Sequence, residues 1–306
     1  MSLSRPLSTV LTTATLLLTA AGCAAHPGDA AAEPAASTEH SLESGGISRD
    51  YRVYRPAAAR DGAPLVVVLH GGYGSGAQAE RAYGWNEQAD ADGFVVAYPD
   101  GLARAWNTEG GDCCGPAERR SVDDVAFISA MVAAITREHG IDSARVYLTG
   151  MSNGGIMAYT LACRTALFAA VAPVAATRLA DCPAPAPVSV LHIHGSADEA
   201  VRYDGAPGDN RSTVIDGPPV PELHAEWRRH QGCPDPVITA AGPVTTSRAT
   251  CPEDREVTLI TIDGAGHQWP GADPTPMRER LLGTDPPSTA IDATATIAQF
   301  FARHRR

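Results

Sequence analysis

The chain of 306 residues contains no lysine, and its 24 lysine-plus-arginine positions are all arginines. This absence excludes chemistry that needs a lysine amine, namely Schiff-base catalysis, P-loop nucleotide hydrolysis and the serine–lysine hydrolases. Positive charge is also scarce overall, since the formal net charge is −11 at pH 7. We therefore expect no binding to nucleic acid and no attraction to an anionic membrane surface.

The chain also lacks a long hydrophobic run. The N-terminal apolar stretch from Leu11 to Ala21 is too short to cross a bilayer, and it follows Arg5. This pattern predicts a signal peptide over residues 1–22. The run Ala20-Ala-Gly-Cys23 resembles a bacterial lipobox, which implies a lipid-modified Cys23 that anchors an exported protein to the outer face of a bacterial cell. Ala20 departs from the branched residue usual there, so cleavage that releases a secreted protein is the alternative.

Large apolar side chains are nearly missing from the segment after Cys23. Residues 24–48 are mostly Ala, Pro, Ser, Glu and Gly, which cannot offset the entropy lost when a chain becomes ordered. We expect a flexible tether over residues 23–48. The remaining residues, 49–306, are enough for one folded domain, and no internal repeat divides them.

An even set of cysteines remains after Cys23, and in an exported chain such a set indicates disulfide bonds. These cysteines are Cys113, Cys114, Cys163, Cys182, Cys233 and Cys251. Pairing of sequence neighbours would join Cys163 to Cys182 and Cys233 to Cys251, and would leave Cys113 and Cys114 as a vicinal bridge. The sequence alone does not fix the connectivity. Zinc binding is the competing use, but no repeated C-x-x-C motif with a histidine pair is present.

A serine stands between two glycines in the run Thr149-Gly-Met-Ser152-Asn-Gly-Gly, at the end of a strand-like stretch that starts at Val146. This is the pattern of a nucleophile elbow, a sharp turn from strand to helix that exposes the serine hydroxyl above a sheet. Gly150 and Gly154 suit it because the crowded backbone leaves no room for Cβ atoms. An ordinary turn serine is the alternative, and the context of the motif decides between them.

Two later strand-like runs supply the residues that such a serine needs. The first, from Val188, breaks at Gly195 and is followed by Asp198, and the second, from Val257, breaks at Gly264 and is followed by His267. The order serine, aspartate, histidine is that of the α/β-hydrolases. We predict Ser152 as nucleophile, His267 as the base that accepts its proton, and Asp198 as the acid that orients the imidazole.

A tetrahedral intermediate also needs hydrogen-bond donors for its oxyanion. The apolar run from Pro64 ends in His70-Gly-Gly-Tyr73, where this fold directs backbone N–H groups toward the nucleophile. We predict the N–H groups of Asn153 and of the Gly72–Tyr73 segment, with Tyr73 as donor. Substrate-lining roles are predicted for His70, Gly72, Trp106 and Trp269, the last because aromatic side chains dominate such pockets.

With these motifs the chain resembles a family of secreted esterases related to poly(3-hydroxybutyrate) depolymerases and to feruloyl and acetylxylan esterases. The matching stretches are Leu69-His-Gly-Gly, Trp106-Asn, Cys113-Cys-Gly-Pro, Ser121-Val-Asp-Asp-Val, Thr149-Gly-Met-Ser-Asn-Gly-Gly, His192-Ile-His-Gly-Ser-Ala-Asp and Gly264-Ala-Gly-His-Gln-Trp-Pro-Gly. The resemblance implies the same three roles for Ser152, Asp198 and His267. The glycine- and proline-rich loop 203–221 departs from the family pattern.

The alternation of strand-like and helix-like runs predicts a single α/β-hydrolase domain with a mostly parallel sheet and helices on both faces. We expect a monomeric serine esterase that needs no metal or organic cofactor and acts on short hydroxyalkanoate esters or oligomers. Feruloyl or acetylxylan ester hydrolysis is the first alternative. Peptidase activity and a non-catalytic lipoprotein that binds a ligand in the same cleft are the others.

Three further patterns have competing interpretations. Gly72-Tyr-Gly74-Ser-Gly-Ala77 with Asp100 matches a dinucleotide fingerprint, but an exported protein has no nicotinamide supply. The pair His192 and His194 invites a metal interpretation, but Ser196 occupies the place of the acid that such a site needs, so a structural role is favoured. Ser121 and Asp124 are predicted to form a capping box for a helix over 122–138, and His139, His224 and His230 are expected to face solvent.

Overall fold

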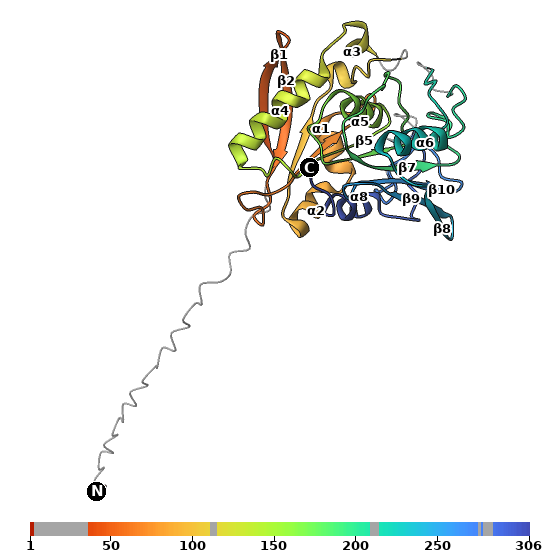
Figure 1. Cartoon of the computed structure of the whole chain (residues 1–306). Coiled ribbons are helices and arrows are strands. Elements are labelled where there is room, and N and C mark those ends of the chain that lie inside the picture. The colour runs from red at the N-terminus through yellow and green to blue at the C-terminus, as the bar shows by residue number, and fades with distance from the viewer. Residues whose placement is uncertain (3–35, 111–114, 209–213, 275–276, 278–283) are drawn as a thin grey trace. The chain divides into compact units, whose positions relative to one another are not determined.

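The computed structural model (Figure 1) describes residues 1–2, 36–110, 115–208, 214–274, 277 and 284–306. Residues 3–22 of the predicted signal peptide, together with Cys23, Cys113 and Cys114, lie outside these residues. Ala35–Arg306 forms one compact unit. None of the helices in the described part of the chain combines the length and the apolar character needed to cross a bilayer.

A ten-stranded sheet forms the centre of this unit, with the strand order β1-β2-β4-β3-β5-β6-β7-β10-β9-β8. The six strands from β4 to β10 in that order run parallel, and antiparallel pairs extend both edges. The strands are β1 (Thr38–Ser44), β2 (Ile47–Tyr54), β3 (Leu65–Leu69), β4 (Val95–Pro99), β5 (Val146–Met151), β6 (Ala170–Val174), β7 (Ser189–Gly195), β8 (Val237–Ala241), β9 (Val244–Thr250) and β10 (Glu256–Ile262).

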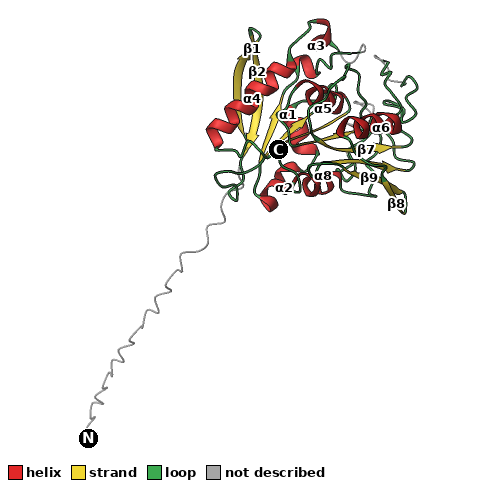
Figure 2. Cartoon of the chain, viewed as in Figure 1, coloured by secondary structure: helices red, strands yellow, loops and turns green. Residues whose placement is uncertain are grey.

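Helices cover both faces of this sheet, as Figure 2 shows. They are α1 (Gly76–Ala82), α2 (Trp85–Asp92), α3 (Pro116–Arg119), α4 (Asp124–His139), α5 (Asn153–Arg164), α6 (Val220–Gln231) and α8 (Ala293–Phe301), with a short 3-10 turn η1 at Leu102–Arg104. The predicted fold class, a mostly parallel sheet between helices in the α/β-hydrolase arrangement, is confirmed.

Alternate side chains of each central strand enter different hydrophobic cores, because successive residues of a strand point to opposite faces. In β3, Leu65, Val67 and Leu69 pack with α4, α5 and α6, whereas Val66 and Val68 pack with α1, α2 and α8. All five side chains are at most 2% exposed. Burial on both faces explains why β3 is a continuous apolar run in the sequence and lacks the alternation of an edge strand.

The predicted boundary of the tether is wrong, since part of residues 23–48 is folded. Thr38–Ser44 forms β1 and pairs antiparallel with β2 through a turn at Gly45 and Gly46. Both glycines have positive φ, at 60° and 75°, as a two-residue hairpin turn requires. β1 is largely exposed, so its polar composition concealed a strand that backbone pairing holds in place. The Gly-Gly pair was the available signal.

The start of α4 also differs from prediction. Asp123 is the N-cap, and its Oδ1 accepts the N–H of Ala126 at 2.7 Å. Asp124, expected to complete a capping box with Ser121, is 1% exposed and accepts a hydrogen bond from Arg49 of β2 at 2.6 Å. Its second oxygen accepts the N–H of Asn107 at 2.8 Å. Asp124 thus joins β2, α4 and the loop that follows β4.

Two disulfide bonds close short loops in the described residues. Cys163 near the end of α5 bonds to Cys182, and Cys233 after α6 bonds to Cys251 after β9. Both pairings agree with those predicted from sequence proximity. Their presence is consistent with an exported protein, because disulfides persist mainly in oxidising compartments.

We predict that Arg49→Met lowers the free energy of unfolding by about 3–5 kcal/mol, because it leaves the carboxylate of Asp124 buried without its countercharge. Urea denaturation would measure this change. Arg52→Met is the matched control, because Arg52 lies on the same strand as Arg49 and pairs with Glu39 and Glu80. Its side chain is 24% exposed, so its loss should lower the free energy of unfolding by about 1 kcal/mol or less. Equal effects of the two substitutions would contradict this account.

Candidate active site

The three predicted catalytic residues leave the sheet at the same edge. Ser152 directly follows β5, Asp198 lies in the loop after β7, and His267 lies in the loop after β10. β5, β6, β7 and β10 are consecutive and parallel in the sheet, so their carboxyl ends meet at one edge. This edge is where ligands bind in open α/β sheets.

Ser152 occupies the sharp turn that the sequence predicts. Its backbone has φ 55° and ψ −124°, a left-handed conformation that is strained for a residue with a side chain. Hydrogen bonds hold the turn on both sides: the Ser152 N–H donates to the carbonyl of Val174 in β6 at 2.9 Å, and the Ser152 carbonyl accepts the N–H of Ile156 at 2.8 Å. The serine therefore stands between the strand and the N-terminus of α5.

The flanking glycines are needed for steric reasons, as predicted. A Cβ atom on Gly154 would lie 2.5 Å from the carbonyl oxygen of His70, and one on Gly150 would lie 2.6 Å from the carbonyl oxygen of Gly154. Backbone carbonyls cannot move away easily, so any larger residue at either position would displace the turn. The same closeness shows that the loop after β3 packs directly on the elbow.

Asp198 and His267 form a buried hydrogen-bonded pair. Nδ1 of His267 and Oδ2 of Asp198 are 2.8 Å apart, and the two residues are 5% and 3% exposed. The other oxygen of Asp198 accepts the N–H groups of Ala200 and Val201 at 2.9 and 2.8 Å. Burial tends to raise the pKa of Asp198, but His267 and His194 outweigh it, so the pKa lies well below the usual range for a carboxyl group.

The contact with Asp198 fixes the tautomer of the neutral His267 ring. Because Nδ1 faces the ionised Asp198, it carries the proton, and Nε2 bears the lone pair of the neutral ring. Burial tends to lower the pKa of His267, yet the charge and hydrogen bond of Asp198 and the charge of Asp285 raise it above its ordinary value. The His267 N–H also donates to Oδ2 of Asp285 at 2.6 Å. No sequence motif pointed to Asp285.

The predicted oxyanion donor Tyr73 is wrong in detail. The Tyr73 N–H donates to the carbonyl of Arg104 at 2.8 Å and so points into the neighbouring loop. Within the described residues, the N–H of Gly72 makes no hydrogen bond. The adjacent Gly71 touches the elbow, since a Cβ on it would lie 3.6 Å from Cβ of Ser152. Asn153 is the first residue of α5, where N–H groups point out of the helix end.

The substrate-lining prediction is wrong for His70 and Trp106, which are both fully buried. Nδ1 of His70 donates to the carbonyl of Gly71 at 2.8 Å, and its Nε2 accepts the N–H of Gly101 at 2.9 Å. Burial lowers the pKa of His70 to about 4, so the ring is neutral. Nε1 of Trp106 donates to the carbonyl of His70 at 2.9 Å. Both side chains brace the loop that carries Gly72.

Trp269 is also part of the core, in contrast to its predicted place in the cleft. It is 3% exposed, its ring stacks on Tyr83 with centroids 4.3 Å apart, and its Nε1 donates to Oγ1 of Thr294 at 3.0 Å. Tyr73, next to Gly72, is by contrast an aromatic residue that is 49% exposed. The prediction for Trp269 failed because a motif does not reveal which way a side chain points.

The dinucleotide interpretation fails on the geometry of Asp100. Its Oδ1 accepts the N–H of Gly76 at 2.8 Å, at the start of α1, so the carboxylate that would bind a ribose is already used by the glycine-rich loop. His192 and His194 have the favoured structural role, since their rings hydrogen-bond to each other at 2.9 Å. His224 is 1% exposed, and the expectation that it faces solvent is wrong.

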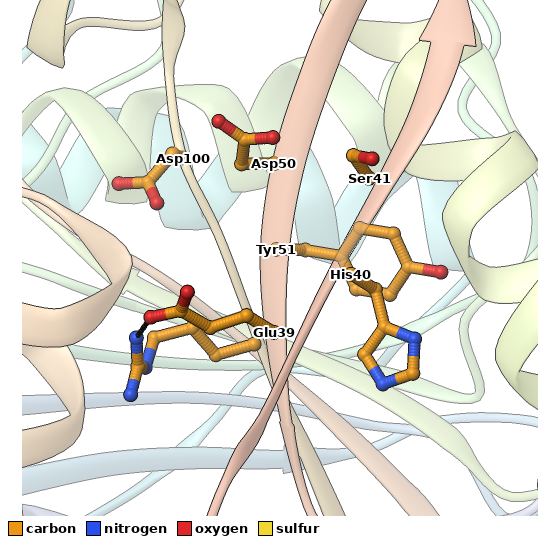
Figure 3. Close-up of a pocket in the computed structure, with 7 residues that line it drawn as sticks. Glu39, His40, Ser41, Asp50, Tyr51 and Asp100 are labelled. Atoms are coloured by element: carbon orange, nitrogen blue, oxygen red, sulfur yellow. Dashed lines mark hydrogen bonds and ion pairs between the residues drawn. The ribbon is translucent and has the colours of Figure 1, made fainter.

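A pocket at the far edge of the sheet is separate from these residues. Figure 3 shows it on the β1–β2 hairpin, where Asp50 and Asp100 lie near each other and His40 lies against Tyr51. The His40 and Tyr51 rings stack with centroids 5.2 Å apart, and Glu39 pairs with Arg52. None of Ser152, Asp198 and His267 lines this pocket.

The model of the family described as "Esterase PHB depolymerase" matches residues 49–226. The chain belongs to this family. It is 34% identical over 279 residues to a Nocardia uniformis subsp. tsuyamanensis protein named as an esterase, NocK, with 81% of this chain and 78% of that protein covered. It is 32% identical over 222 residues to Feruloyl esterase B of Piromyces equi. That match covers 67% of this chain and 39% of the Piromyces protein.

Solved structures agree on the fold. An acetyl xylan esterase from Aspergillus awamori superimposes with a TM-score of 0.58 at 16% identity and covers 80% of this chain and 98% of its own. A thermostable esterase gives a TM-score of 0.54 at 16% identity, with 88% and 63% covered. The resemblance predicted from the sequence motifs is therefore confirmed: the protein is an esterase of the α/β-hydrolase fold.

We predict that the imidazole of His267 titrates above the ordinary histidine value of about 6.5. The physical reason is that the ionised Asp198 stabilises the charged ring, so Asp198→Asn should move the titration to lower pH. Histidine side-chain NMR over a pH series would measure the His267 midpoint in the unmodified protein and in Asp198→Asn. A midpoint at or below 6.5, or one unchanged in Asp198→Asn, would contradict this electrostatic description.

Proposed function

We propose that this esterase hydrolyses carboxylic esters through an acyl-enzyme on Ser152, with His267 as general base and Asp198 as the orienting acid. The observation that carries the proposal is the buried hydrogen bond of 2.8 Å between Asp198 and His267 at the sheet edge where the strained turn presents Ser152. An ionised aspartate on Nδ1 leaves Nε2 of His267 as the atom that can accept a proton.

The proposed reaction has two balanced halves. Oγ of Ser152 attacks the ester carbonyl carbon while its proton passes to Nε2 of His267, and the tetrahedral intermediate then expels the alcohol, which takes that proton. Water attacks the acyl-enzyme next and gives a proton to His267. Collapse of the second intermediate releases the carboxylic acid and returns the proton to the Ser152 oxygen. Asp198 remains ionised throughout and stabilises the imidazolium.

The oxyanion site that we propose consists of the N–H groups of Asn153 and Gly72. Asn153 opens α5, so the partial positive charge of the helix N-terminus adds to its N–H. The amide side chain of Asn153 holds the backbone of Trp106, with its Oδ1 2.8 Å from the Trp106 N–H. Trp106 in turn supports His70, which precedes the Gly71–Gly72 turn. The Tyr73 N–H, engaged by Arg104, is replaced by Gly72 in this account.

For the substrate we propose short hydroxyalkanoate esters or oligomers, the class suggested by the family description. Aromatic acyl esters such as feruloyl esters are the second candidate. They are supported by the named activity of the Piromyces relative and by Tyr73, a 49% exposed residue that directly follows Gly72. A flat acyl group could stack on the Tyr73 ring.

Export is part of the proposal. The Cys163–Cys182 and Cys233–Cys251 bonds support an oxidising compartment. We further propose that a lipid on Cys23 anchors the mature protein. The mass of the N-terminal peptide would test this proposal, because a lipid adds to the mass of the peptide.

We predict that Ser152→Ala lowers kcat for p-nitrophenyl butyrate by about 10⁴-fold or more, because no other group forms the acyl-enzyme. A fluorophosphonate probe should label the unmodified protein once, at Ser152, and Ser152→Ala should stay unlabelled. Ser129→Ala in α4 is the matched control and should keep both activity and label. Undiminished hydrolysis in Ser152→Ala, or absence of labelling in the unmodified protein, would favour the non-catalytic ligand-binding alternative.

A comparison of substrates tests the acyl specificity. We predict a higher kcat/KM for hydroxybutyrate oligomers than for methyl ferulate or acetylated xylan, and no turnover of peptide anilides. Tyr73→Ala should lower kcat/KM for methyl ferulate more than for the oligomers, since stacking is worth about 0.5–1.5 kcal/mol. Preference for methyl ferulate would establish the second candidate, and turnover of the anilides would contradict the ester assignment.

A further inference from the structure

A chain of buried polar side chains lies behind Asp198 and takes no part in the mechanism above. His192 and His194 are two residues apart on β7, and therefore share one face of the sheet. Tyr159 of α5 and His224 of α6 complete the group. All four residues are at most 1% exposed. Burial of this many polar rings is costly unless their hydrogen bonds are satisfied.

The contacts run in series from the catalytic acid inward. Nε2 of His194 lies 3.4 Å from Oδ2 of Asp198 and 2.8 Å from the carbonyl oxygen of Val201. Nδ1 of His194 lies 2.9 Å from Nε2 of His192. Nδ1 of His192 then lies 2.9 Å from the hydroxyl of Tyr159 and 3.1 Å from Nε2 of His224.

Carbonyl chemistry fixes the protons along this series. The carbonyl of Val201 can only accept, so Nε2 of His194 carries a proton. In a ring that carries its proton on Nε2 alone, Nδ1 accepts a hydrogen bond, and Nε2 of His192 must donate it. Nδ1 of His192 then accepts from the hydroxyl of Tyr159. The contacts from Val201 to Tyr159 then each have one donor and one acceptor. Nε2 of His224 is a further neighbour, 3.1 Å from Nδ1 of His192 and 3.4 Å from the Tyr159 hydroxyl.

The surroundings keep the inner rings uncharged. Burial, followed by the neighbouring His194 and His224, lowers the pKa of His192 well below its ordinary value. Burial, followed by the charge of Arg228, lowers the pKa of His224 to about 3. Burial also raises the pKa of Tyr159, so its hydroxyl stays protonated. His192 and His224 therefore stay neutral, and Tyr159 stays protonated, across the pH range in which an esterase works.

We propose that His194 is a positioning residue for Asp198, with its tautomer set by His192 and Tyr159. The inference rests on the proposed role of Asp198 and deepens it. His194 ties the carbonyl of Val201 back to β7, and the N–H of the same Val201 donates to Oδ1 of Asp198 at 2.8 Å. The imidazole thus holds the short loop that holds the carboxylate, and its N–H also faces Oδ2 directly.

Both oxygens of the buried Asp198 carboxylate face hydrogen-bond donors. Oδ1 of Asp198 receives the two backbone N–H groups of Ala200 and Val201, and Oδ2 faces His267 and His194. A carboxylate held on both oxygens keeps one lone pair aimed at His267. Without His194, the loop loses its link to the sheet and the carboxylate can turn away from the base.

Other groups face this site from the neighbouring elements. The Tyr203 ring lies edge-on to the His194 ring, with centroids 5.8 Å apart. The Tyr203 hydroxyl hydrogen-bonds to Thr261 of β10, which is the strand partner of His194 of β7. Asp285 reaches the backbone of His267 from the loop before α8. The charged groups that affect His267 are thus Asp198 and Asp285, and only Asp198 is within reach of His194.

The test compares His194→Phe with His194→Gln on p-nitrophenyl butyrate. Phe keeps the ring but removes the N–H, whereas the Gln amide can place an N–H near the Nε2 position. His194→Phe should lower kcat roughly 10- to 100-fold, as expected for loss of a hydrogen bond that holds a charged group, with KM nearly unchanged. The acid limb of kcat/KM should move to lower pH, since a loosened carboxylate raises the pKa of His267 less.

His194→Gln should recover most of kcat and return the acid limb to its original position. His230→Gln, at a partly exposed histidine on α6, is the control and should change neither. A folded His194→Phe with an unmoved acid limb, or a His194→Gln variant no better than Phe, would overturn the inference. If hydrolysis of the unmodified protein does not depend on Ser152, the proposed function itself fails, whatever the His194 variants do.

A measurement on the unmodified protein covers the case in which His194→Phe does not fold. Nitrogen-15 histidine NMR at pH 8 should show His192 and His194 both as Nε2–H tautomers. A Nδ1–H tautomer at His194 would place no donor toward Val201 and Asp198, and would refute the proposal directly.

Discussion

The parallel pairing of β7 with β10 is the constraint on which the candidate site depends. In that register Ile262 lies opposite Gly195, so the loops that carry Asp198 and His267 leave the sheet side by side. A Cβ on Gly195 would lie 2.2 Å from the carbonyl oxygen of Ala265, which shows how closely the two loops cross. The N–H of Ala197 donates to that same carbonyl at 2.9 Å. Backbone contacts between the two loops thus bring Asp198 and His267 together, independently of the hydrogen bond between their side chains.

The turn at Ser152, with its positive φ, is the second constraint on the site. Its backbone is strained, and the surrounding contacts must offset this strain. The offset comes from tight contacts on three sides: the carbonyl of Val174, the glycines flanking the serine, and the loop after β3. His70 and Trp106 stabilise that loop through hydrogen bonds to the carbonyls of Gly71 and His70. A rigid support of buried polar side chains therefore surrounds a turn that would not persist by itself.

Sequence reasoning was most successful where a residue's position follows from the chain path. Ser152, Asp198 and His267 each follow a buried strand and stand beside glycines, and parallel strands deliver such residues to one edge. It failed where the answer lay in side-chain direction or in contacts between distant segments. His70 and Trp106 sit in motifs near the site yet point into the core. Asp285 and the contacts of His194 have no local signature, and the exposed polar strand β1 lacks the apolar alternation by which strands are found.

The structure of the protein after reaction with a phosphonate ester tests the central claim most directly, since the phosphorus mimics the tetrahedral intermediate. The account predicts a covalent bond from phosphorus to Oγ of Ser152, with Nε2 of His267 within hydrogen-bonding distance of Oγ. It also predicts a phosphonyl oxygen within about 3.1 Å of the N–H groups of Asn153 and Gly72. A phosphonate attached elsewhere, or its oxygen directed away from both N–H groups, would contradict the account.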